Sequence, residues 1–261
     1  MVHQINISKR NLVLLVLIVA GVVMVFLTGC TSQQSLQEAA KGSTKHGWSI
    51  YKKGEYDEAI GYFNQAIKLD SDFSEAYYGL GWAYFKTQRY DEALENFNRA
   101  ISLDPNLADA YDGCGWVFYK QGDYVRAINE FNESIKRDPT LAYAYDGRGW
   151  TYFKTQRYDE ALENFNRAIS LDPDFADAYD GRGWVFYKQS DYARALNEFN
   201  EAIKLDPTLA YAYDGRGWTY FKTGKYDLSI VDFNQAIKLR PHFPDAQKGL
   251  QHALSKPVSW D

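Results

Sequence analysis

Small and aromatic residues recur at helical spacing in two blocks, and this pair of blocks is repeated along most of the chain. Residues 142–175 illustrate the pattern. Positions three and four apart lie on one face of an α-helix, so each block predicts an amphipathic helix. The blocks in this segment consist of Tyr145, Gly149 and Tyr152, and then of Ala161, Phe165 and Ala168.

The boundaries of the two helices are also marked in this segment. A polar turn around Gln156 separates the blocks. The second helix is expected to end at Asp172, because Pro173 cannot continue it and biases the preceding residue out of the α region. The segment therefore predicts two paired helices joined by a short turn.

Internal repetition has a period of 34 residues, with stronger matches at 68. Residues 84–105 are identical to 152–173, and 138–155 are identical to 206–223, which indicates that a pair of units has been duplicated in tandem. A frame that starts at Ala40 gives six units, 40–73, 74–107, 108–141, 142–175, 176–209 and 210–243.

A truncated copy follows the sixth unit and predicts a capping helix over residues 244–255, before a tail at 256–261. Pro244 suits the first turn of a helix, and Pro257 would end it. The apolar side chains of this helix are expected to face the last unit and the polar ones to face water. The first group is Leu250 and Leu254, and the second is Gln247, Lys248 and Gln251.

The order of an aromatic residue, Gly, Tyr, Ala, Phe, Ala and Pro in a 34-residue frame resembles the tetratricopeptide repeat. The resemblance covers residues 40–255 and implies an all-α fold, a right-handed superhelical solenoid of six helix-turn-helix units. It also implies that the first helices line a concave groove that holds a peptide segment or a partner protein. A lone repeat cannot bury its apolar face, so stacking supplies the core.

Function is expected in positions that the family leaves variable, counted here as slots from the first residue of each unit. Slot 9 is always Trp, slot 12 is always aromatic and slot 13 is always Lys. Slot 5 is Asp in four units. The residues are Trp48, Trp82, Trp116, Trp150, Trp184 and Trp218; Tyr51, Phe85, Tyr119, Phe153, Tyr187 and Phe221; Lys52, Lys86, Lys120, Lys154, Lys188 and Lys222; and Asp112, Asp146, Asp180 and Asp214.

These slots lie on one face of the first helix, because they are three or four residues apart. The sequence thus predicts a ligand groove with an acidic row, two aromatic rows and a lysine row. Glycine in slot 6, as in Gly147 and Gly181, is expected to clear room for an indole. Two interpretations compete: the tryptophans contact a ligand, or they only pack between neighbouring helices.

Slot 7 departs from the family, which normally has an inward-facing leucine there. Three units carry arginine instead, at Arg148, Arg182 and Arg216. A buried guanidinium needs partners, so each arginine is expected to bridge to a carboxylate on a neighbouring helix. The alternative is that the groove is shifted and the arginines face the ligand.

The first thirty residues have the features of a bacterial lipoprotein signal. Lys9 and Arg10 precede an apolar stretch of about sixteen residues, shorter than the roughly 20 residues of a membrane span. Leu27, Thr28, Gly29 and Cys30 resemble a lipobox, which implies a signal peptide at 1–29 and a lipid on Cys30. The alternative is an uncleaved signal anchor.

Either form of this signal places the body of the chain outside the cytoplasm and on a membrane. The resemblance implies the periplasmic face of the outer membrane in a Gram-negative host, and otherwise the outer face of the plasma membrane. Residues 30–39 are expected to form a lipidated cysteine and an extended polar tether. The signal contains two basic residues and no acid, so the mature chain would carry 27 basic and 34 acidic side chains, a net charge of −7.

Composition narrows the function further. The net charge of −5 and the lack of basic blocks argue against nucleic acid as a partner. Two cysteines exclude a disulfide framework, and no histidine is paired with a nucleophile, so we expect no enzyme, no metal and no cofactor. The 16% of aromatic residues instead suits a binding scaffold for an extended peptide. The alternatives are a cell-wall glycan stacked on the indoles and a structural spacer without a ligand.

Overall fold

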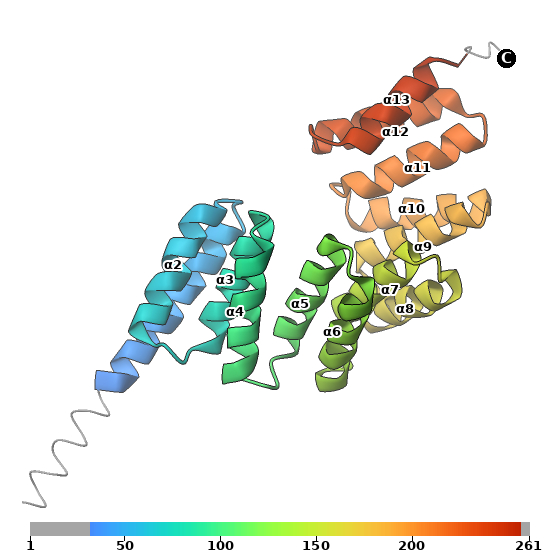
Figure 1. The fold of residues 1–261 in the computed structure, drawn as a ribbon. Helices are drawn as coiled ribbons and strands as arrows, with labels where there is room; N and C mark the ends of the chain where they lie inside the picture. The colour runs from blue at the N-terminus through green and yellow to red at the C-terminus, as the bar shows by residue number, and fades with distance from the viewer. Residues whose placement is uncertain (1–31, 257–261) are drawn as a thin grey trace, which may run out of the picture. The chain divides into compact units, whose positions relative to one another are not determined.

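The described part of the chain, residues 32–256 of a computed structural model, consists of helices and connecting turns without a strand. A helix over residues 32–51 comes first, and two helices per unit follow (Figure 1). The others are α2 (Tyr56–Leu69), α3 (Ser74–Lys86), α4 (Tyr90–Leu103), α5 (Ala108–Gln121), α6 (Tyr124–Arg137), α7 (Ala142–Lys154), α8 (Tyr158–Leu171), α9 (Ala176–Lys188), α10 (Tyr192–Leu205), α11 (Ala210–Lys222), α12 (Tyr226–Leu239) and α13 (Pro244–Leu254). The predicted all-α solenoid of paired helices is confirmed.

The described residues divide into two compact parts, 32–105 and 106–256. In the first, α3 packs against both α2 and α4. Within residues 106–256, the first helices α5, α7, α9, α11 and α13 each contact the next one, whereas the second helices contact only first helices. The first helices of this part therefore form a layer in which consecutive helices are in contact, whereas the second helices do not contact one another.

Each unit carries one core phenylalanine in slot 24, and five of them form a joint between consecutive first helices: Phe63, Phe131, Phe165, Phe199 and Phe233. All six of these side chains are fully buried. Phe165 lies between two glycines: a Cβ atom at Gly149 would be 2.8 Å from its ring, and one at Gly181 would be 2.4 Å away. The prediction that slot-6 glycines clear room for an indole is therefore wrong, because the ring that occupies the space is the core phenylalanine of the preceding unit.

The turn between the two helices of each unit requires a residue with left-handed backbone conformation at slot 15. Gly54, Gly122 and Gly224 have φ of 87°, 80° and 78°, and Gln88, Gln156 and Ser190 have φ of 62°, 61° and 63°. Glycine adopts this conformation without a steric penalty, whereas the other three residues hold it under strain. The predicted turn around Gln156 is thus present in all six units.

The slot-7 arginines tie the second helices together. Arg182 donates to Glu198 Oε2 (2.7 Å) on α10 and to Asn166 Oδ1 (2.8 Å) on α8. Arg216 makes the same pair of contacts, to Asp232 (2.8 Å) and Asn200 (2.7 Å). The expected carboxylate bridge is confirmed for these two arginines, and the alternative of a ligand-facing guanidinium is excluded because their partners lie on the outer helices.

Arg148 differs from the other two arginines. Its guanidinium donates to the amide oxygens of Asn164 (2.8 Å) and Asn132 (2.6 Å), so it bridges two asparagines and no carboxylate. The prediction of an ion pair is wrong at this position. The bridge still spans the two neighbouring second helices, because its partners lie 16 residues before and 16 residues after the arginine.

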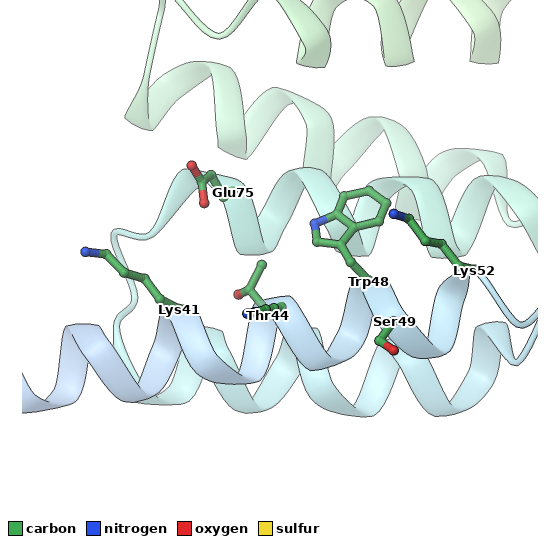
Figure 2. A pocket seen from close by; sticks show the side chains of 7 residues that line it. Lys41, Thr44, Trp48, Ser49, Lys52 and Glu75 are labelled. Carbon is green, nitrogen blue, oxygen red and sulfur yellow. The ribbon is translucent and has the colours of Figure 1, made fainter.

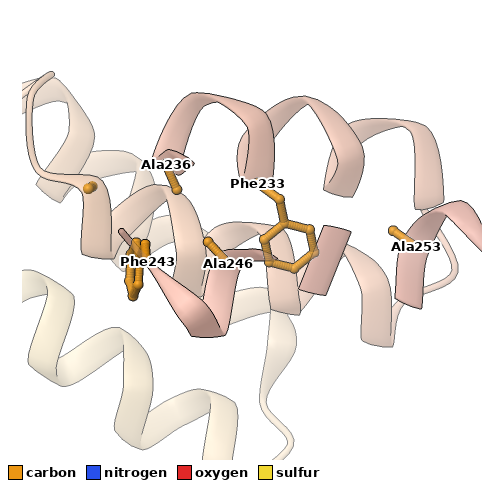
Figure 3. Close-up of a cluster of buried hydrophobic side chains, with 6 residues drawn as sticks. Phe233, Ala236, Phe243, Ala246 and Ala253 are labelled. Atoms are coloured by element: carbon orange, nitrogen blue, oxygen red, sulfur yellow. The ribbon is translucent and has the colours of Figure 1, made fainter. Parts of the chain in front are cut away.

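The capping helix α13 covers the end of the last unit (Figure 3). Ala246, Gly249 and Ala253 form its buried stripe, and a Cβ atom at Gly249 would be 2.4 Å from the Phe233 ring. The exposed polar face is confirmed. Leu250 is half-buried as expected, but Leu254 is 63% exposed, because the close approach places the small residues at the contact.

The region next to the predicted lipid anchor is more ordered than expected. Residues 32–39 belong to the helix over 32–51, so the stretch predicted as an extended tether is helical from residue 32. Because a helix rises about 1.5 Å per residue, less than half the rise of an extended chain, residues 32–39 span less than half of the length expected for an extended tether. Cys30, the signal peptide and the tail from residue 257 lie outside the described residues. Within residues 32–256, no helix is both long and apolar enough to cross a membrane.

Candidate ligand-binding face on the first helices

The tryptophans of slot 9 are half-buried and lie on the first helices in all six units. Each indole meets the slot-24 phenylalanine of its own unit at a ring-centroid distance of 5.3–5.7 Å, mostly edge to face. Aromatic pairs in this geometry contribute about 0.5–1.5 kcal/mol beyond the burial of area. The tryptophans are thus anchored in the joint between units and still keep part of their surface exposed.

The slot-12 rings extend this contact along each first helix. They lie 5.2–5.8 Å from the tryptophan of the same unit. On their other side they meet the slot-17 tyrosine that opens the second helix, as in the 5.9 Å contact of Phe153 with Tyr158. Every unit therefore contains a chain of four rings from slot 17 through slots 12 and 9 to slot 24. The two competing interpretations of the tryptophans are compatible, because the rings both pack and remain accessible.

The slot-13 lysines are the exposed charges of this face. All six are exposed, and each follows a half-buried slot-12 ring. The Lys120 ammonium lies 5.8 Å from the centroid of the neighbouring Tyr119 ring. We call the exposed surface made by slots 9, 12 and 13 the aromatic–lysine face.

The slot-5 aspartates do not belong to this exposed surface. Asp112, Asp146, Asp180 and Asp214 are only 3–4% exposed, and one carboxyl oxygen of each has no hydrogen-bond partner. The predicted acidic row of a groove is therefore wrong as a surface feature. The indole N–H of Trp218, four residues later on the same helix face, donates to the Asp214 carboxyl group.

Burial makes these four carboxyl groups weak acids. It is the main cause that raises the pKa of Asp112, Asp146 and Asp180 well above the usual value, and nearby acids such as Asp177 add to the effect on the last two. The pKa of Asp214 is raised to about 7, by burial and by Asp245 of α13. A carboxyl group with such a pKa is largely protonated in mildly acidic solution, so it adds little negative charge to the inner side. Within residues 32–256 no group of three or more His, Cys, Asp or Glu side chains is placed to hold a metal ion.

A cavity of about 600 Å³ lies on the same side of the first part of the chain, between the helix over 32–51 and α3 (Figure 2). Its lining includes slots 2, 5, 9 and 13 of the first unit. The sequence pattern did not predict this cavity, although the first unit is the only one with Lys in slot 2 and Thr in slot 5, at Lys41 and Thr44. The lining residues are Lys41, Thr44, Lys45, Trp48, Ser49, Lys52 and Glu75.

Cys114, the one cysteine among the described residues, takes no part in this face. It is fully buried and free, and burial raises the pKa of its thiol far above the usual value. A thiol that stays protonated is a poor nucleophile.

Similarity to solved structures extends over most of the chain. The chain resembles one in the structure of the APC/C hetero-tetramer Cut9–Hcn1, with a TM-score of 0.75 and 18% sequence identity. The match covers 86% of this chain and 45% of the longer chain in that structure. PilW, described as a widely conserved type IV pilus biogenesis factor, gives a TM-score of 0.67 and 18% identity over 81% of this chain and 98% of PilW. PilF of Pseudomonas aeruginosa gives a TM-score of 0.66 and 17% identity over 82% of this chain and 97% of PilF. At these identities the similarity concerns the fold alone.

Family models agree with the internal repeats. No curated protein sequence matches the chain significantly. Models described as tetratricopeptide repeat match residues 44–108, 108–141 and 210–243, and one described as TPR repeat matches 149–190 and 183–224. These repeats generally form non-catalytic scaffolds for protein–protein interaction. The chain therefore belongs to the tetratricopeptide repeat family.

Proposed function

We propose that this protein is a membrane-anchored scaffold outside the cytoplasm that holds an extended segment of a partner protein along the aromatic–lysine face. The observation that carries the proposal is the regular exposure of this face on the contacting first helices α5, α7, α9 and α11. Each of these helices offers an anchored indole and an exposed lysine in the same order.

An extended peptide matches this surface better than a compact ligand does. The side chains of an extended segment recur at regular intervals, as the tryptophans and lysines do from helix to helix. Anchored rings lose little conformational freedom on binding, which favours affinity. The exposed lysines can pair with acidic side chains or backbone carbonyl groups of the segment.

Charge reversal on this face tests the proposal without disturbing the core. We expect the double variant Lys154→Glu and Lys188→Glu to lose most of its in-cell crosslinking to partner proteins, because both lysines are exposed on the aromatic–lysine face. The measurement is crosslinking followed by capture of the mature protein, with helix content and melting recorded in parallel. Tryptophan substitution is less informative, because each indole also packs on a core phenylalanine.

The matched control is Lys238→Glu, an exposed lysine on the second helix α12, which should leave the captured proteins unchanged. Unchanged capture by the double variant would contradict a role for this face. Binding of purified cell wall that depends on the same two lysines would favour the glycan alternative. Absence of any bound partner in the wild type would favour a spacer.

The membrane anchor is proposed to be a lipid on Cys30. We expect Cys30→Ala to release the protein from the membrane fraction and to abolish incorporation of labelled palmitate, because this residue is the acceptor implied by the lipobox. The control is Cys114→Ala, which should keep both properties because that thiol is buried. Retention of the Cys30→Ala variant in the membrane would point to an uncleaved apolar segment.

A further inference from the structure

The slot-5 aspartates of residues 106–256 form a row across consecutive first helices. Each of α5, α7, α9 and α11 carries one of them, and each helix of this series contacts the next (Figure 1). The four side chains are 3–4% exposed, and the Oδ1 atom of each is inaccessible to solvent and has no hydrogen-bond partner among the described residues. A carboxylate in such a place loses its hydration without replacement, at a much higher cost in free energy than a neutral carboxyl group. These positions therefore favour the protonated form.

The ionisable groups that face the row supply no positive charge. Row members face one another across the helix contacts, and slot 2 adds three acids beside them. Burial raises the pKa of two nearby hydroxyls and one thiol, so these groups stay neutral. Within residues 32–256, no facing group comes from a second helix and no row member forms an ion pair. The acids are Asp109, Asp177 and Asp245, and the neutral groups belong to Tyr119, Tyr187 and Cys114.

Ionisation along the row is coupled. Asp146 faces Asp112 and Asp180, and a charge on one carboxyl group raises the pKa of the next. Asp214 ends the row, and the Trp218 indole N–H that donates to it lowers its pKa. Burial still raises that pKa to about 7, so Asp214 ionises as the solution passes from mildly acidic to mildly alkaline.

The row lies directly beside the joints between first helices. Gly181 follows Asp180 in the chain, and a Cβ atom at this glycine would be 2.4 Å from the Phe165 ring. A contact this close leaves no room for water, so an ionised aspartate can be hydrated only if neighbouring first helices separate. The slot-9 indoles stand on the same helices, so their positions change when the helices move.

We propose that the slot-5 aspartates form a proton-controlled switch in the layer of first helices. With the row protonated, these helices pack closely and the aromatic–lysine face has a fixed spacing. As the row ionises, water enters beside the joints, the helices loosen and the indoles lose their fixed positions. The ligand of the buried carboxyl groups is thus the proton. The inference goes beyond the proposed function, because it requires no partner protein.

The first experiment is hydrogen exchange of the mature chain at pH 5.5 and pH 8.5, with each rate divided by the intrinsic rate at that pH. Protons bound to the folded state stabilise it below the raised pKa values and are lost above them. The amides of α7, α9 and α11 should therefore lose at least roughly tenfold in protection at pH 8.5. The triple variant Asp146→Asn, Asp180→Asn and Asp214→Asn should lose less than about threefold, because its side chains stay neutral.

The matched control is a second triple variant, with three exposed aspartates replaced by asparagine. It should lose as much protection at pH 8.5 as the wild type does. The substitutions are Asp159→Asn, Asp174→Asn and Asp227→Asn. Helix content at pH 5.5 verifies the fold of both variants.

The second measurement follows the Trp218 indole N–H proton by nuclear magnetic resonance. Its resonance should shift with a midpoint near pH 7 in the wild type and stay constant in Asp214→Asn, because this N–H donates to that carboxyl group. The change Asp245→Asn should move the midpoint to lower pH, since Asp245 raises the pKa of Asp214.

Equal losses of protection in the wild type and in the triple variant at the row would overturn the inference. A Trp218 resonance that titrates without any change in protection would also overturn it, because the helices would then keep their packing after ionisation. The proposed function fails or holds separately, since it is decided by crosslinking through Lys154 and Lys188 at a single pH.

Discussion

Replacing Gly79 by alanine is expected to lower the free energy of unfolding of the first part of the chain, residues 32–105, by about 3 kcal/mol. A Cβ atom at this position would lie 2.3 Å from Cε1 and 2.6 Å from Cζ of the Phe63 ring. The ring cannot move away, because a Cβ atom at Gly47 on its other side would already be 2.9 Å from it. The two first helices must therefore separate, and the joint between the units is weakened.

The measurement is denaturant unfolding of the mature chain, with hydrogen exchange to assign the loss to residues 32–105. The matched control is Gly61→Ala in α2, where nothing lies within 4 Å of the new Cβ atom. This change is expected to raise stability by about 0.5–1 kcal/mol, since alanine is the better helix former. Adding Phe63→Leu to Gly79→Ala should cost less than the sum of the two single changes. A Gly79→Ala protein as stable as the Gly61→Ala protein would refute this account of the joint.

Replacing Asp214 by asparagine is expected to stabilise the folded chain at pH 8 by about 4 kcal/mol. The pKa of Asp214 is raised from 3.8 to about 7, so the folded state binds a proton that the unfolded state has released between these values. The stability contributed by this group is fully present below pH 3.8, falls as the pH rises, and is lost above pH 7. Asparagine is neutral throughout and avoids this loss.

The measurement is the difference in unfolding free energy between the variant and the wild type as a function of pH. It should be near zero at pH 4, increase by about 1.4 kcal/mol per pH unit and level off above pH 7. Asp227→Asn, an exposed change in the first turn of α12, serves as the control and should alter stability by less than about 1 kcal/mol. A constant difference over the whole range would show that the folded state does not protonate Asp214.

Most of the fold could be predicted from the sequence, because the 34-residue repeat indicates which residues each helix buries. The helix ends at Leu171 and Leu239 follow the expected pattern, and the cap starts at Pro244. Leu254 was predicted to face inward and is exposed instead. The sequence does not indicate how closely α13 approaches Phe233, and at this close approach only small residues such as Gly249 and Ala253 fit at the contact.

The candidate site was predictable only in part. Spacing correctly places Trp150, Phe153 and Lys154 on one helix face, but spacing does not determine depth on that face. Asp146 shares the face and is nevertheless buried, at 4% exposed. Likewise, the role of Gly181 depends on Phe165 of the preceding unit, a contact between units that the pattern within one unit does not reveal.

The arginine bridges have a mechanical consequence for residues 106–256. Consecutive first helices are joined by fully buried phenylalanines, whereas neighbouring second helices are linked through arginines of the first helices, such as Arg182 between Asn166 and Glu198. We therefore expect bending of this part to change the spacing of the second helices more than that of the first helices. The aromatic–lysine face lies on the first helices, so its rings and lysines are expected to keep their spacing when the protein flexes.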